Sequence, residues 1–391
     1  MKNAPSLLRE AIAIMFLSSF SVGRTPCFSG VIAILLALTG CASRPTSDVL
    51  KPVALKTDTA ETLSVLAVTN RERRNDDGSF GTRWGSNVHY DRFVFSVPAD
   101  RDGATIRYPA AKPDPKRDYI VLQRQKLSLD DLVRDATRAA NFDGTASIFV
   151  HGYNYSYQEA LFRTAQVAAD AKAMSPPIMF SWPSAASVTG YVADRDAVLY
   201  SRTELDALLR ALGRSPKIKR IILFGHSMGG FLSMEVARQL KLQGRDDVLS
   251  KLQIVLAAPD IDTDVFQSQL QDIGRLRNPI ILLVSKKDDA LSISSFVSGE
   301  RPRVGLLDIR DPIIEKTAKA EHLTVIDISS LRSSDGLGHD RYASLAKFAG
   351  DLHDAETRMR SNGRNIGAFV FDAAGAAVAS PFKLAGQIVS Q

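Results

Sequence analysis

One short stretch has the residue types and spacing of a nucleophilic serine: residues 225–229, with the sequence Gly-His-Ser-Met-Gly. The apolar residues 221–224 before it indicate a buried strand, and residues 231–240 after it carry apolar side chains at helical spacing. A strand, a sharp turn and a helix in this order present a serine hydroxyl at the tip of the turn. Glycine at both ends of the turn avoids collisions across it. We therefore predict that Ser227 is the nucleophile of an acyl-transfer enzyme, and we call residues 225–229 the elbow.

Two backbone N–H groups are candidates for stabilising the oxyanion that such an attack creates. The N–H of Met228, at the start of the helix, points to where the oxyanion would form. The second donor should come from the loop after an earlier strand. Residues 146–150 are such a strand, and Gly152 allows the following backbone to pass close to the elbow. We expect the N–H of Tyr153 to pair with that of Met228, and His151 to hydrogen-bond within its loop.

A serine hydroxyl is a poor nucleophile until a base takes its proton, and the base needs an acid to orient it. In open α/β sheets such groups collect at the carboxyl ends of strands. One known chain order is nucleophile, acid, histidine. Asp288 follows the second strand after the elbow, and His339 follows the strand after that. We predict that these two residues complete a triad with Ser227.

Other residues compete for both roles. Asp260 follows the strand before the one that Asp288 follows, and Asp289 is adjacent to Asp288, so both stay open as alternative acids. Among the histidines, His322 precedes the last strand and so falls at the wrong edge of the sheet. The remaining histidines are less suitable as well: His89 in a loop region far upstream, His226 facing away from the turn, and His353 within a helix.

Aromatic residues near the strand ends are candidates for a substrate pocket. Tyr155 and Trp182 are the two we assign to it, with Tyr153 and Phe180 as further candidates. Large aromatic side chains at strand ends are as often core residues, and the sequence leaves the two interpretations open.

Strands alternating with helices are expected to position these groups. The strand candidates are residues 63–69, 92–97, 119–122, 146–150, 178–183 (running into a loop), 221–224, 252–257, 280–284 and 323–328. The helix candidates are residues 129–140, 158–173, 194–212, 231–240, 264–273 and 342–353. This alternation predicts an α/β fold with a mostly parallel, doubly wound sheet flanked by helices. Residues 70–87, rich in Arg, Gly and Asp, are expected to form a loop.

The N-terminal region carries an apolar run, residues 31–38, that is too short to span a membrane and ends in Leu-Thr-Gly-Cys. Leu-x-Gly-Cys after such a run resembles the bacterial lipoprotein signal, in which the cysteine is lipidated and becomes the mature N-terminus. The resemblance implies a signal peptide over residues 1–40, starting at Met1 or Met15, and lipid on Cys41. Ala42, where Gram-negative inner-membrane lipoproteins carry Asp, favours a cell-envelope location on the periplasmic face of the outer membrane. An ordinary secretory signal or an uncleaved anchor is the alternative.

Composition limits the partners. The 391 residues are 45% hydrophobic and 24% charged, which suits a globular protein. The chain has two cysteines, Cys27 within the signal and Cys41, so we expect no disulfide and no metal or other cofactor. The net charge of +6 comes without a basic block interleaved with aromatics, so we expect no nucleic acid partner.

The expected organisation has four parts. After the signal peptide, residues 41–60 are small, polar and proline-containing and indicate a tether. Residues 61–355 would form the catalytic domain. Residues 356–391 would be a C-terminal extension of unknown role, in which residues 367–371 are a strand candidate.

Several segments together resemble one bacterial branch of the α/β-hydrolases, a group of unknown function loosely assigned to the esterase/lipase superfamily. The matching segments, in order, are residues 149–154, 180–184, 194–202, 224–229, 257–260, 285–291 and 301–303. The resemblance covers residues 60–355. It implies the α/β-hydrolase fold, with Ser227, Asp288 and His339 as the triad.

We expect a serine hydrolase that cleaves carboxylic esters of small molecules or lipids and is held at a membrane by its lipid anchor. Amide, thioester or peptide cleavage by the same triad is the first alternative. A catalytically silent binding or scaffold protein of the cell envelope is the second.

Overall fold

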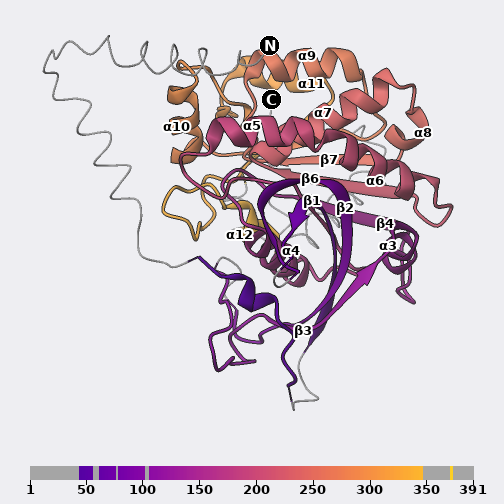
Figure 1. The fold of residues 1–391 in the computed structure, drawn as a ribbon. Helices are drawn as coiled ribbons and strands as arrows, with labels where there is room; N and C mark the ends of the chain where they lie inside the picture. Colours follow the sequence, from indigo (N-terminus) through magenta and orange to yellow (C-terminus); the bar gives the residue numbers. More distant parts are fainter. Residues whose placement is uncertain (1–43, 56–60, 76–77, 102–104, 347–369, 373–391) are drawn as a thin grey trace, which may run out of the picture. The chain divides into compact units, whose positions relative to one another are not determined.

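A ten-stranded sheet is the centre of the computed structural model, which describes residues 44–55, 61–75, 78–101, 105–346 and 370–372 (Figure 1). The strand order is β10-β9-β8-β7-β6-β4-β5-β1-β2-β3. The strands are β1 (Thr62–Arg73), β2 (Phe80–Ser96), β3 (Ile120–Leu127), β4 (Thr145–Val150), β5 (Ile178–Ser181), β6 (Arg220–His226), β7 (Leu252–Ala257), β8 (Ile280–Val284), β9 (Leu323–Asp327) and β10 (Val370–Asp372). The described residues from Pro45 onward belong to one compact unit.

Most neighbouring strands are parallel. Every pair from β10 across to β1 is parallel, whereas β2 pairs antiparallel with both β1 and β3 at one end of the sheet. The central strands are short and almost wholly apolar, as strands covered on both faces must be. The expected mostly parallel α/β sheet is confirmed.

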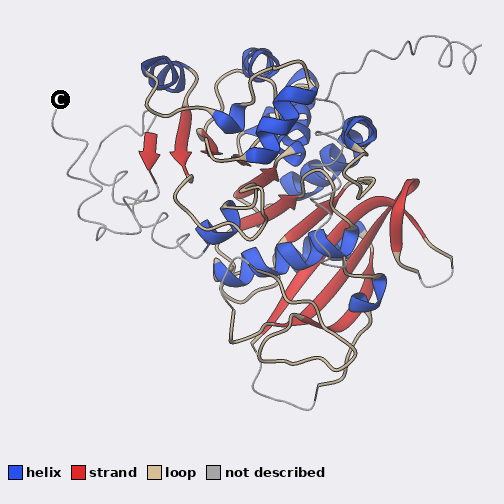
Figure 2. Ribbon diagram, turned by 90° about the vertical axis from the view of Figure 1, so that its left-hand side faces the viewer, coloured by secondary structure: helices blue, strands red, loops and turns tan. Residues whose placement is uncertain are grey.

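Helices cover both faces of the sheet (Figure 2). They are α3 (Leu129–Ala136), α4 (Tyr157–Asp170), α5 (Tyr191–Tyr200), α6 (Arg202–Arg214), α7 (Met228–Leu242), α8 (Asp246–Leu249), α9 (Thr263–Ile273), α10 (Asp289–Val297), α11 (Pro312–Ala320) and α12 (Tyr342–Leu345), with 3₁₀ turns η1 (Ser47–Leu50) and η2 (Val304–Leu306). Alternate residues of β4 serve the two faces: Ile148 and Val150 join the core under α6 and α7, and Phe149 joins the core with α12.

The first hairpin differs from expectation. Residues 70–87 are not mainly a loop, because β1 continues to Arg73 and β2 starts at Phe80, with Arg71 opposite Trp84. An antiparallel hairpin at the end of a sheet leaves one face to solvent, so alternating charged residues are compatible with strand pairing. The low apolar content of this segment therefore gave the wrong prediction.

The helices also differ in places. The helix expected over residues 194–212 is two helices that meet at Ser201, whose hydroxyl donates to the carbonyl of Ala197 (2.8 Å) and accepts from the side-chain amide of Asn70 (2.9 Å). These bonds hold a break between α5 and α6. Helices α10 and α11 were not expected, and α12 covers only the start of the helix expected over residues 342–353; residues 347–353 lie outside the described ones.

Part of the expected tether packs against the domain. Val49 and Leu50 of η1 are buried in the core between β3 and α4, and the N–H of Val53 donates to the carbonyl of Val121 (2.9 Å). Two buried apolar side chains, each contributing about 1.5–3 kcal/mol, outweigh the polar composition around them. The folded domain therefore begins at Pro45 rather than near residue 61.

The structure describes part of the C-terminal extension but not the N-terminal residues 1–43. β10 (Val370–Asp372) adds a parallel strand beside β9 and overlaps the end of the strand candidate at residues 367–371, so part of the C-terminal extension joins the sheet. The signal peptide over residues 1–40 and Cys41 lie outside the described residues. Within the described part of the chain, no helix combines the length and apolar character needed to cross a bilayer.

Candidate active site

Ser227 lies in the sharp turn between β6 and α7, with φ 53° and ψ −121°. A non-glycine residue with positive φ is strained, and such strain is typical of functional turns. A Cβ at Gly225 would come within 2.6 Å of the Gly229 carbonyl oxygen, and a Cβ at Gly229 would overlap the carbonyl of Val150. Both glycines are therefore required for the turn to close.

The serine is less open than expected for the tip of a turn. Only 3% of its surface is exposed. The loop after β4 lies across it, so that a Cβ at Gly152 would come within 2.8 Å of the Ser227 Cβ and 2.9 Å of the His226 Nδ1. The close approach that we expected of Gly152 is thus present, and it places the next residue, Tyr153, beside the elbow.

The two expected oxyanion donors belong to the two segments that meet at this contact. Met228 is the first residue of α7, and N–H groups in the first turn of a helix have no acceptor within it. The positive end of the helix dipole also favours negative charge at this position. Tyr153 follows Gly152, so its N–H belongs to the loop pressed against Ser227. The two N–H groups remain the predicted oxyanion donors.

Asp288 and His339 form the central hydrogen bond of the site. The Nδ1 of His339 lies 2.7 Å from the Oδ2 of Asp288, whose side chain is fully buried. The other oxygen, Oδ1, accepts the N–H of Leu291 (2.9 Å) and caps α10. With Nδ1–H donating to Asp288, the Nε2 of His339 is left as the acceptor, which is the tautomer a general base needs.

His226 of the elbow contacts the loop that carries His339. Its Nε2 donates to the carbonyl oxygen of His339 (3.1 Å), and the two rings are 4.6 Å apart between centroids. Burial, and then the charge of His339, hold the pKa of His226 well below its ordinary value, so His226 stays neutral. Because His226 directly precedes Ser227, this contact ties the loop that carries His339 to the residue before the predicted nucleophile.

A pH dependence follows from the pKa of His339. Burial by itself lowers this pKa, but the charge and hydrogen bond of Asp288 outweigh burial and raise it above the ordinary value. His339 accepts a proton only when neutral, so kcat/KM should rise with pH as the imidazolium deprotonates, with a midpoint above about 6.5. A pH profile on a soluble ester measures this; a midpoint at or below the ordinary value would contradict the role of Asp288.

The alternative acids are engaged elsewhere. Asp260 forms a buried ion pair with Arg303 (3.2 Å) and accepts hydrogen bonds from Tyr191 (2.9 Å) and Ser294 (2.7 Å). Asp289 is exposed at the first position of α10. Of the three candidate carboxylates, Asp288 is the one that contacts His339.

The other histidines lie away from this bond. His322 precedes β9 at the opposite edge of the sheet, and His89 packs against Phe80 on β2. His353 lies outside the described residues.

The aromatic candidates divide between core and site. Trp182 and Phe180 are fully buried, and the indole N–H of Trp182 donates to the carbonyl of His151 (2.8 Å). Residues 151–156, the loop that carries the predicted oxyanion donor Tyr153, are called the oxyanion loop below. Trp182 therefore supports this loop from the core and does not line an open pocket. Tyr155 is half-buried, and its ring packs edge-on against His226 with 6.2 Å between the ring centroids. Tyr153 is also half-buried, and its hydroxyl donates a hydrogen bond to the carbonyl of Val188.

His151 and Arg71 hold the oxyanion loop from beneath. Burial, followed by the charge of Arg71, lowers the pKa of His151 to about 3, so its neutral ring bonds the Gly152 carbonyl (2.8 Å) within the loop, as expected. Arg71 is fully buried and donates to the Tyr155 carbonyl (3.0 Å) and the Ser181 hydroxyl (3.0 Å). Arg71 was not among the predicted site residues, because it falls in residues 70–87, the segment expected to form a loop.

A buried ion pair fixes the loop that carries His339. Arg163 on α4 lies 3.0 Å from Asp340, and both side chains are less than a tenth exposed. Asp340 also accepts the Ser334 N–H (2.9 Å), and Asp335 accepts the N–H of His339 (2.9 Å). None of these residues was predicted, because Arg163 and Asp340 are far apart in sequence and the other contacts lie within a polar loop.

In the part of the chain that is described, His, Cys, Asp and Glu side chains form no group of three or more that could hold a metal ion. A cavity of about 280 Å³ is lined in part by Arg71, Ser156 and Tyr157, and Ser227 is not among its lining residues.

The sheet, the elbow and the Asp–His pair define an α/β-hydrolase. Residues 134–355, more than half of the chain, match the family described as "Alpha/beta hydrolase of unknown function (DUF900)". The chain belongs to this family.

Comparison with other proteins gives only distant likenesses. A search of curated proteins finds no match. Among solved structures, the chain is similar to a CIB-like hydrolase from Thermoplasma acidophilum (18% identity, 59% of this chain and 89% of that one, TM-score 0.33). It is also similar to dienelactone hydrolase from Anabaena variabilis (14% identity, 69% of this chain and 93% of that one, TM-score 0.33). A further similar structure is esterase Est22 (12% identity, 91% of this chain and 97% of that one, TM-score 0.31).

Proposed function

We propose that this α/β-hydrolase cleaves carboxylic esters through a covalent acyl-enzyme on Ser227. The observation that carries the proposal is the 2.7 Å hydrogen bond between Asp288 and His339, held against the elbow by His226. A buried carboxylate bonded to one imidazole nitrogen leaves the other nitrogen basic and oriented, which is the requirement for activating a serine.

In the first half-reaction, the Ser227 oxygen attacks the ester carbonyl carbon while His339 takes the hydroxyl proton on Nε2. The carbonyl oxygen becomes an oxyanion that accepts hydrogen bonds from the N–H groups of Tyr153 and Met228. When the intermediate collapses, the C–O bond to the alcohol breaks and His339 gives its proton to the departing oxygen. The acyl group is left on Ser227.

In the second half-reaction, water attacks the acyl carbon while His339 again accepts a proton. Collapse of this intermediate releases the carboxylic acid and returns the proton to Ser227. Asp288 remains a carboxylate throughout and stabilises the imidazolium that forms twice in each cycle.

The test combines covalent labelling with a substrate panel. A fluorophosphonate probe should label wild-type protein at Ser227, and p-nitrophenyl esters from acetate to palmitate should be hydrolysed with a defined preference for chain length. Absence of labelling would favour the scaffold alternative. Labelling together with faster turnover of matched amides or thioesters would assign the same triad to another acyl-transfer reaction.

We also propose that the enzyme is lipid-anchored in the cell envelope, on the periplasmic face of the outer membrane. The support is the apolar run at residues 31–38 followed by Leu-Thr-Gly-Cys, with Ala42 after the cysteine. Each buried methylene contributes about 0.8 kcal/mol, so two or more acyl chains give stable attachment. The substrates would then be small-molecule esters or lipids at that membrane.

Replacing the cysteine tests the anchor. Cys41→Ser should move the protein from the membrane fraction to the soluble fraction and abolish palmitate labelling, because residue 41 is the only lipidation site proposed. Its specific activity on a soluble ester should be retained. Fractionation and radiolabelling measure the result; a wild type that is soluble and unlabelled, or a variant that stays in the membrane, would contradict the proposal.

A further inference from the structure

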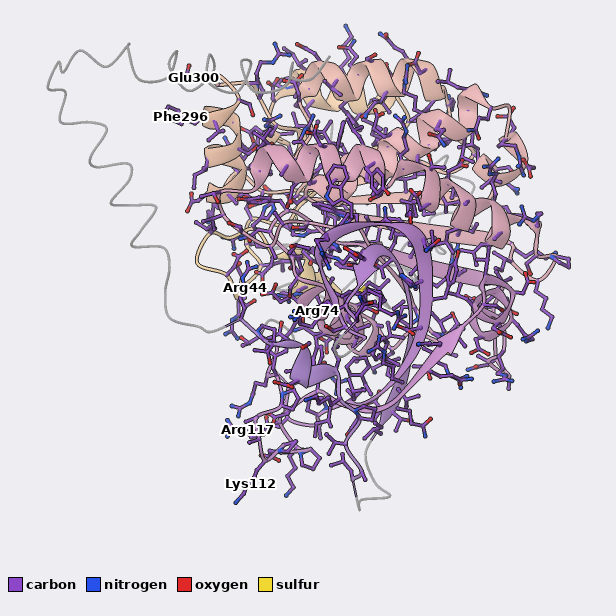
Figure 3. All side chains as sticks on the ribbon, in the orientation of Figure 1. Arg44, Arg74, Lys112, Arg117, Phe296 and Glu300 are labelled. Atoms are coloured by element: carbon purple, nitrogen blue, oxygen red, sulfur yellow. The ribbon has the colours of Figure 1, made fainter. Side chains whose placement is uncertain are left out.

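Five large apolar side chains are exposed in two neighbouring segments, and we call them the apolar rim. On α10, Ile293, Phe296 and Val297 are 41%, 67% and 63% exposed. Val188, just before α5, and Val192, in its first turn, are 58% and 73% exposed. The three on α10 follow helical spacing, so they form one face of that helix. Figure 3 shows the side chain of Phe296 pointing outward from α10. An exposed apolar face of this kind is typical of an interaction surface.

The two segments of the rim are joined to each other and to the catalytic residues. The hydroxyl of Tyr191 on α5 lies 2.9 Å from that of Ser294 on α10, so the segments are neighbours. Asp288, which holds His339, caps the N-terminus of α10. On the other segment, the carbonyl of Val188 accepts the hydroxyl of Tyr153, whose N–H is the proposed oxyanion donor. The rim therefore borders the site.

The folded domain begins close to the same loop. The Nε2 of Gln158, in the first turn of α4, donates to the carbonyl of Pro45 (2.6 Å). A few residues earlier, the N–H of Asn154 donates to Asp194 on α5 (3.1 Å). The short segment 153–158 thus contacts the first residue of the domain at one end and the rim helix α5 at the other.

We propose that the apolar rim docks on the surface of the lipid bilayer that holds the proposed anchor, with the active-site edge of the sheet facing the membrane. This inference rests on the proposed lipidation of Cys41. Four residue steps separate Cys41 from Pro45, and a fully extended chain spans at most about 14 Å over that length. A tether this short keeps the edge that carries segment 153–158, and with it the rim, next to the bilayer.

Docking of the rim on the bilayer would narrow the range of esters that reach the enzyme. Esters of amphiphiles that reside in the bilayer would reach Ser227 along the rim without leaving the membrane surface. Soluble esters would have to diffuse into the gap between domain and membrane. The enzyme should therefore favour membrane-borne esters over water-soluble ones of the same acyl group.

A fluorescence experiment tests docking without requiring catalysis. The full chain carrying Phe296→Trp or Leu242→Trp is purified from membranes and reconstituted into phosphatidylcholine vesicles with and without brominated acyl chains. Leu242 is a matched control, because it is 65% exposed but ends α7, about 21 Å along the helix from the elbow. Emission from Trp at 296, after subtraction of the parent chain, should fall at least twofold with brominated lipid, and emission from Trp at 242 should not.

Three outcomes would overturn the inference: no quenching at position 296, equal quenching at both positions, or emission at 296 that is already blue-shifted without vesicles. The last would indicate a second copy of the chain covering the rim. None of these depends on ester hydrolysis, so failure here is distinguishable from failure of the proposed reaction.

A kinetic experiment tests the substrate class. For Phe296→Asp, the ratio of hydrolysis of a long-chain ester in vesicles to hydrolysis of a soluble short-chain ester should fall about tenfold or more, because a charge replaces a membrane-inserting ring. For Leu242→Asp the ratio should equal that of the wild type. An unchanged ratio in Phe296→Asp would overturn the proposed preference.

Discussion

Ser227→Ala should lower kcat for ester hydrolysis on the order of 10⁶-fold, because removal of a nucleophile from a triad that acts as a unit leaves only binding and oxyanion stabilisation. The hydroxyl makes no packing contact that alanine cannot make, so the protein should remain folded. Steady-state kinetics on p-nitrophenyl acetate, with thermal unfolding as a check on the fold, measure both expectations.

Ser233→Ala is the matched control for this variant. Ser233 lies on the same helix, is fully buried, and donates its hydroxyl to the Gly229 carbonyl (2.8 Å). Its removal should leave fluorophosphonate labelling at Ser227 intact. If Ser227→Ala retains more than a few per cent of wild-type activity in a homogeneous preparation, Ser227 is not the nucleophile.

Asp288→Asn should cost about 10⁴-fold in kcat, because an amide can hold the wrong tautomer of His339 and cannot stabilise the imidazolium. Asparagine is as good an N-cap as aspartate, so the cap that Asp288 provides for α10 should survive. The loss should therefore appear in kcat without a matching loss of thermal stability. The acid limb of the pH profile should also move to lower pH, since the carboxylate that raises the pKa of His339 is gone.

Two variants control for this effect. Asp289→Asn changes an exposed neighbouring carboxylate and should alter kcat less than about twofold, as surface changes away from a site usually do. Asp260→Asn disturbs the ion pair with Arg303 and should act mainly on stability. A 10⁴-fold loss in Asp260→Asn together with near-normal kcat in Asp288→Asn would place the acid one strand earlier.

The sequence is most informative where the signal is local. Residues 221–240 combine an apolar strand, the two glycines of the elbow that avoid backbone collisions, and an apolar helix. The structure has each of these elements in place. The positions of Asp288 and His339 after consecutive strands follow from parallel topology alone. Parallel strands bring their carboxyl ends to one edge of the sheet, however far apart they are in sequence.

The supporting contacts could not be predicted, because no local pattern encodes them. Arg163 and Asp340 are 177 residues apart, and neither position differs in composition from a solvated surface. Arg71 looked like part of a polar loop, because a buried arginine satisfied by carbonyl groups has no sequence signature of its own. The docking of Val49 and Leu50 was missed for the opposite reason: two apolar residues are too few to stand out in a polar segment.

Asp288 uses its two oxygens for separate tasks, one holding His339 and the other capping α10. The helix that follows needs only to supply an N–H three residues on, at Leu291, to keep that carboxylate in place. The exposed residues Ile293, Phe296 and Val297 further along α10 make neither of these contacts, so changes there should leave the Asp288–His339 bond intact. The exposed face of α10 could therefore be exchanged, by evolution or by design, to alter the proposed substrate preference while the Asp288–His339 pair is kept.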